Sequence, residues 1–66
     1  MKVVVNGETR TVRDGATLRD LLAELKLEGK PVAVERNREV VLRARYAETQ
    51  LAESDILEIV HAVGGG

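Results

Sequence analysis

The sequence predicts an α+β domain in which one main helix covers a mixed sheet of four to five strands. Three observations support this fold class. Short β-branched runs lie near both ends of the chain, Asn6–Gly7 is typical of a tight hairpin turn, and one stretch carries leucines at helical spacing. With 66 residues and no cysteine, the chain has room for a single core that apolar packing and hydrogen bonds must stabilise.

The first two strands are expected at residues 2–6 and 9–12. The first, KVVVN, is rich in β-branched residues, and the second, TRTV, alternates polar side chains with a valine at its end. Asn6 and Gly7 both tolerate positive φ, which the tightest hairpin turns require. Asp14–Gly15 then breaks the chain before the helix.

The helix is expected to begin after Thr17, which can form a capping box with Asp20. One apolar stripe follows at the spacing i, i+3, i+4 and i+7, made of Leu18, Leu21, Leu22 and Leu25. Gly29 and Pro31 close the helix or its exit loop. Because this helix is the only one available to cover the sheet, we interpret the stripe as core rather than as a partner surface.

The second half of the chain predicts three further strands, at residues 32–35, 39–42 and 56–63. The turn between the first two falls at Asn37–Arg38, and residues 43–50 are expected to be irregular with one short helical turn. In the last strand, Leu57 and Ile59 share one face, whereas Glu58 and Val60 share the other.

The first and last strands are expected to pair in parallel in the middle of the sheet, because a crossover containing the helix joins them. The inner face would meet the helix through Met1, Val3, Val5, Leu57 and Ile59. This arrangement is the β-grasp, or ubiquitin-like, fold. The predicted domain covers residues 1–61, and residues 62–66 form a flexible glycine-rich tail.

Composition argues against several classes of function. The net charge is −1 with acids and bases mixed along the chain, and Tyr46 is the only aromatic residue, which disfavours nucleic-acid binding. The longest apolar run is too short for a membrane span, and the opening MKVVVNGE lacks the length of a signal peptide. We therefore expect no nucleic-acid partner, no membrane partner and a cytoplasmic location.

No catalytic or metal-binding constellation stands out. His61 is the only histidine and Ser54 the only serine, and cysteine is absent. Glu53 and Asp55 are interpreted as a solvated turn rather than a catalytic pair. The pair of bases Arg43 and Arg45 is interpreted as a solvated edge, with an anion or a partner's acidic patch as the alternative.

The C-terminal glycines are the candidate site. Residues 62–66 could extend roughly 17 Å, and Gly64, Gly65 and Gly66 carry no side chains, so they could enter a narrow tunnel in another protein. The terminal carboxylate becomes a good electrophile once it is activated as an acyl-adenylate. The alternative is that these glycines are merely disordered or remain from cloning. Val60 and Val63, beside the tail, are candidate docking residues.

The segments VNGE, TLRDLL, VAVERN, VVLRARYAETQL and DILEIVHAVGGG, in this order and spacing, resemble the ThiS-like sulfur carriers of the thiamine pathway. The resemblance covers essentially the whole chain. Two turns depart from the family pattern, which often has glycine where this chain has Arg38 and Ser54.

The resemblance implies that a ThiF-like adenylating enzyme uses ATP and Mg to activate Gly66. A cysteine desulfurase system would supply persulfide sulfur, and a thiazole synthase would accept it from the resulting thiocarboxylate. The carrier itself would bind no cofactor, no metal and no nucleotide. The alternatives are a carrier for molybdopterin, cysteine or tRNA thiolation, a ubiquitin-like protein modifier attached to lysines, and a plain binding module.

Overall fold

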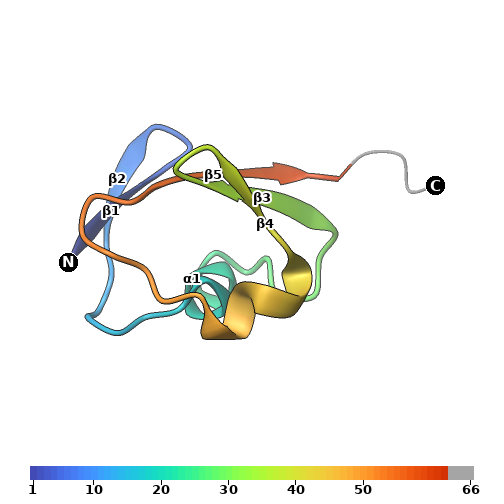
Figure 1. The fold of residues 1–66 in the computed structure, drawn as a ribbon, viewed down its shortest axis with the longest axis horizontal. Helices are drawn as coiled ribbons and strands as arrows, with labels where there is room; N and C mark the ends of the chain where they lie inside the picture. The colour runs from blue at the N-terminus through green and yellow to red at the C-terminus, as the bar shows by residue number, and fades with distance from the viewer. Residues whose placement is uncertain (63–66) are drawn as a thin grey trace.

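The computed structural model describes residues 1–62, which form a five-stranded sheet with helices on one side (Figure 1). The elements in chain order are β1 (Lys2–Val5), β2 (Glu8–Thr11), α1 (Leu18–Glu24), β3 (Val32–Arg36), β4 (Glu39–Val41), the 3₁₀ helix η1 (Arg43–Glu48) and β5 (Ile56–His61). Across the sheet the order is β2-β1-β5-β3-β4. β1 and β5 are parallel and every other pair is antiparallel, so the predicted β-grasp topology is confirmed.

Both predicted hairpin turns place two consecutive residues at positive φ. Asn6 and Gly7 have φ of 49° and 84°, and Asn37 and Arg38 have φ of 51° and 72°. This backbone matches the twist of the flanking strands, which explains the asparagine in each first position. Arg38 adopts the left-handed region despite its Cβ, at a cost of about 1 kcal/mol.

Helix α1 begins where the capping box predicts it. The backbone N–H of Asp20 donates to Thr17 Oγ1 (3.1 Å), and the N–H of Thr17 donates to Asp20 Oδ2 (2.9 Å). The hydrogen bond from the Thr17 backbone is the main cause that holds the pKa of Asp20 below its usual range.

The helix ends earlier than the leucine stripe suggests. Lys26 has φ of 61°, and the N–H of Leu27 donates to the carbonyl oxygen of Leu22 (2.8 Å), which is the geometry of a Schellman cap. Leu25 is therefore the cap residue, and Gly29 lies in the exit loop.

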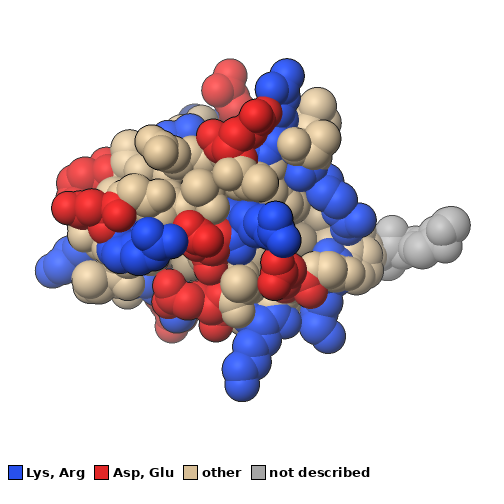
Figure 2. Space-filling view, turned by 90° about the horizontal axis from the view of Figure 1, so that it is seen from below, with Lys and Arg blue, Asp and Glu red and all other residues tan. Residues whose placement is uncertain are grey.

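The expectation that α1 alone covers the sheet is wrong, because η1 packs beside it on the same side (Figure 1). η1 brings Tyr46 partly buried against the core. Seen from this side, the surface mixes acidic and basic side chains without a continuous basic region (Figure 2). Neither helix within residues 1–62 has the length and apolar character needed to cross a membrane.

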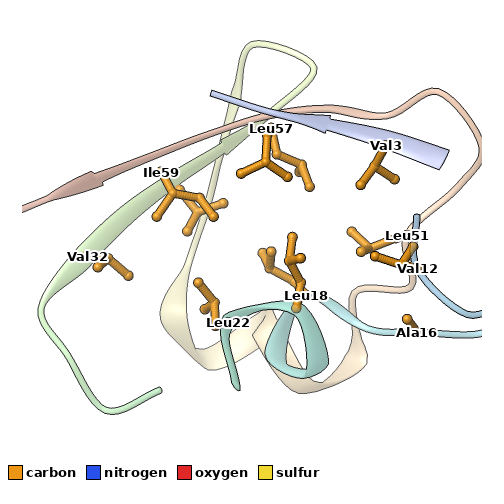
Figure 3. Close-up of a cluster of buried hydrophobic side chains, with 12 residues drawn as sticks. Val3, Val12, Ala16, Leu18, Leu22, Val32, Leu51, Leu57 and Ile59 are labelled. Carbon is orange, nitrogen blue, oxygen red and sulfur yellow. The ribbon is translucent and has the colours of Figure 1, made fainter. Parts of the chain in front are cut away.

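The core lies between the sheet and α1 (Figure 3). Its fully buried side chains include Val3 and Leu57 from the central strands and Leu18 and Leu21 from the helix, as the alternation and the stripe predict. The segments outside helices and strands add three further buried apolar residues, which are Val12, Ala16 and Leu51.

Candidate functional site

β5, the strand that leads to the C-terminal glycines, is hydrogen-bonded along both edges. It pairs in parallel with β1 through Val5↔Leu57 and its neighbour, and antiparallel with β3 over five residue pairs ending at Val32↔His61. The N–H of Ala62 then donates to the carbonyl oxygen of Pro31 (2.7 Å). The backbone is therefore held in the sheet up to the last residue that the structure describes.

The side chain of Asn6 extends the pairing between β1 and β5 beyond the end of β1. Its Nδ2 donates to the carbonyl oxygen of Ile59 (3.0 Å), and its Oδ1 accepts from the N–H of Ile59 (2.8 Å). The primary amide thus occupies the place of a peptide group in a strand. Sequence reasoning identified Asn6 as a turn residue only. The available signal was the choice of asparagine, which carries both a donor and an acceptor.

The start of β5 is fixed by a buried polar cluster around Asp55, so the expectation of a solvated turn is wrong for this residue. Asp55 is only 5% exposed. Its carboxylate accepts from the Ala52 N–H (2.8 Å), Arg36 Nε (2.9 Å) and Asn37 Nδ2 (3.0 Å). Burial raises the pKa of Asp55, but these three hydrogen bonds outweigh it, and the pKa lies below its usual range.

The face of the sheet opposite α1, here named the outer face, carries the candidate docking residue Val60. β5 places Ile56, Glu58 and Val60 on it, because Leu57 and Ile59 are buried on the other side. Val60 is 59% exposed, as the alternation predicts. Val63, Gly64, Gly65 and Gly66 lie outside the described residues, so their roles stay predictions.

The remaining candidate side chains lie apart from one another. Arg45 pairs with Glu48 on η1 (2.6 Å), whereas Arg43 donates to the carbonyl oxygen of Lys30 (3.3 Å). Glu53 accepts from the N–H of Lys2 (3.0 Å), and His61 is exposed at the end of β5. Within residues 1–62, no three acidic or histidine side chains gather where they could bind a metal ion. The described residues thus hold β5 in the sheet by hydrogen bonds and leave its outer face exposed.

Comparisons with known proteins agree with this architecture. The family model described as the ThiS family matches residues 3–66. The sulfur carrier protein ThiS of Bacillus subtilis is 48% identical over 63 residues, which cover 94% of this chain and 96% of that protein. A protein named thiazole synthase from Paramagnetospirillum magneticum is 46% identical over 66 residues, which span all of this chain but only 20% of that protein.

A solved structure is similar over the whole length. The crystal structure of a thiamine biosynthesis protein, ThiS, from Geobacter metallireducens matches with a TM-score of 0.86 and 33% sequence identity, and the match covers 100% of both chains. This match therefore includes every strand of the sheet. The chain therefore belongs to the ThiS family, the sulfur carrier proteins of thiamine biosynthesis.

Proposed function

We propose that Gly66 is the residue of this carrier that bears sulfur, as a C-terminal thiocarboxylate destined for thiazole formation. The observation that carries the proposal is the match to the ThiS family, which extends through residue 66. The described geometry is compatible with it, because β5 is hydrogen-bonded on both edges and the chain is held in the sheet as far as Ala62.

The proposed chemistry needs an activating partner, because a carboxylate is a poor electrophile. A ThiF-like adenylating enzyme with ATP and Mg would let the Gly66 carboxylate attack the α-phosphorus, with pyrophosphate leaving. A persulfide supplied by a cysteine desulfurase would attack the acyl carbon and displace AMP. A thiol would then cleave the acyl disulfide and release the thiocarboxylate. These steps place ATP and Mg on the enzyme and leave the carrier without a cofactor.

The acceptor of the sulfur is proposed to be a thiazole synthase. Proteins of that name in two bacteria contain a segment that is 46% identical to this whole chain. Gly64 and Gly65 would provide a narrow approach for Gly66, and Val60 and Val63 would contact the partner beside it. The carrier is proposed to act in the cytoplasm.

The test is intact-mass analysis after incubation with a ThiF-like enzyme, ATP, Mg and a persulfide donor. We expect the mass gain of one oxygen replaced by sulfur, and no gain in a variant that lacks Gly65 and Gly66. Omission of ATP is the matched control. Conversion of the truncated variant, or lysine adducts in place of the mass gain, would refute the proposal.

A further inference from the structure

Two glutamates on the outer face lie directly opposite each other on neighbouring strands. Glu35 on β3 and Glu58 on β5 are Cα partners in the antiparallel register, and both are exposed. Side chains in such a pair have Cβ atoms about 4.5–5.5 Å apart, and like charges at that separation destabilise a sheet. Within residues 1–62, neither carboxylate forms an ion pair or a side-chain hydrogen bond.

The neighbouring cation, Arg36, does not pair with either glutamate. Arg36 follows Glu35 in β3 and therefore points to the opposite side of the sheet. There its Nε binds Asp55 Oδ2 at 2.9 Å. The repulsion between the two glutamates thus remains uncompensated in the described part of the free carrier.

The glutamate pair is surrounded by exposed apolar side chains. Ile56 and Val60 flank Glu58 two residues away on β5 and are 54% and 59% exposed. Val40 is the Cα partner of Glu35 on β4 and is 69% exposed. Exposed apolar side chains that lie together next to polar groups are typical of protein-binding surfaces.

The charge selects the kind of partner. A second copy docked by two-fold symmetry on this face would bring four carboxylates together, which disfavours self-association. A partner surface with an Arg or Lys side chain over the pair would neutralise both carboxylates while its apolar surroundings cover Ile56, Val60 and Val40. One cation between two acids is the complementary arrangement.

We propose that Glu35 and Glu58 form a paired-acid recognition site on the outer face for an Arg or Lys side chain of the ThiF-like adenylating enzyme. This inference rests on the proposed function, because that enzyme must hold the carrier while it activates Gly66. The pair makes the free carrier less stable and the complex more stable, which is a combination that a purely structural role does not produce.

The test compares Glu35→Gln and Glu58→Gln with Glu24→Gln, a matched control on the exposed side of α1. Binding to the purified adenylating enzyme is measured by calorimetry at low and moderate salt, and Tm is measured on the free carrier. We expect each outer-face variant to bind about tenfold more weakly with a reduced salt dependence. We also expect its Tm to rise by about 1–4 °C. The control should match the wild type in affinity.

Other results overturn the inference. Unchanged affinity in both outer-face variants would do so, as would a fall in Tm that accompanies weaker binding. Weakening confined to a thiazole synthase would assign the site to a different partner, and a dimer that forms through this face would contradict the charge argument. If the enzyme forms no pyrophosphate from ATP in the presence of the wild-type carrier, the proposed function fails as well. Pyrophosphate release with unchanged affinity defeats the paired-acid site alone.

Discussion

Replacement of Asp55 by asparagine tests the buried cluster that fixes the start of β5. Asn37 cannot adapt to the change. Its Nδ2 donates to Asp55 Oδ1 (3.0 Å), while its Oδ1 accepts from the N–H of Ile56 (2.9 Å). An amide at position 55 has only one oxygen for these donors. If that oxygen faces Asn37, the new NH₂ opposes the Ala52 N–H and Arg36 Nε; if it faces those two donors, the NH₂ opposes Asn37 Nδ2 unless Asn37 flips and loses the bond to Ile56. Either arrangement leaves a donor without an acceptor.

The cost follows from the bonds that change. Loss of one hydrogen bond to a charged group, together with the loss of the charge facing Arg36, amounts to about 2–3 kcal/mol. A domain of this size has a total unfolding free energy of roughly 3–10 kcal/mol. We therefore expect Asp55→Asn to lower the urea midpoint by about 2 M and Tm by roughly 10–15 °C.

The same variant should have a distinct pH dependence. The pKa of Asp55 is lowered in the folded protein, so its contribution is fully present above the unfolded value of 3.8 and is lost as pH falls through the folded pKa. The gap between wild type and Asp55→Asn should shrink from pH 6 toward pH 2. The pKa of Asp20 is also lowered, but Asp20 is present in both proteins, so its contribution to the difference in stability cancels. Equal urea midpoints at pH 7, or a gap independent of pH, would refute this reasoning.

Three other substitutions probe the turns and the outer face. Asn6→Asp retains the acceptor for the Ile59 N–H but loses the donor to its carbonyl oxygen, so we expect a loss of about 1–2 kcal/mol in urea unfolding. Arg38→Gly relieves the positive φ and should raise stability by about 0.5 kcal/mol in thermal melts monitored by circular dichroism; a lower Tm would contradict the strain argument. Val60→Asp should leave the fold intact but weaken calorimetric binding to the adenylating enzyme, and an unchanged affinity would remove Val60 from the docking surface.

Features of the fold that depend on neighbouring residues, and the order of the central strands, could be predicted from the sequence. The Asn6–Gly7 turn, the capping box at Thr17 and the leucine stripe each involve residues within a few positions of one another. The central pairing of the first and last strands followed from their β-branched composition and the crossover between them. The exposure of Val60 followed from simple alternation.

Individual side-chain contacts between distant residues could not be predicted in this way, although the pairing of β1 with β5 could. Asp55 resembles a surface turn residue until the fold brings Arg36 and Asn37 to it from 19 and 18 positions away. The end of α1 at Glu24 could not be predicted, because the positive φ that follows the cap falls on Lys26, and a lysine carries no sequence signal comparable to glycine. The pairing of Glu35 with Glu58 needs the register of β3 on β5, which composition does not determine.

The two turn asparagines, Asn6 and Asn37, form their hairpin turns and also bind the backbone of β5. Asn37 accepts from the N–H of Ile56 at the start of the strand, and Asn6 binds both peptide groups of Ile59 near its centre. Each asparagine is also the first residue of a turn at positive φ, a conformation that few other residues tolerate. Bonds in the plane of the sheet thus hold β5 at its edges and leave its outer face free. A partner can therefore bind Glu58 and Val60 without disturbing the interactions that hold the strand.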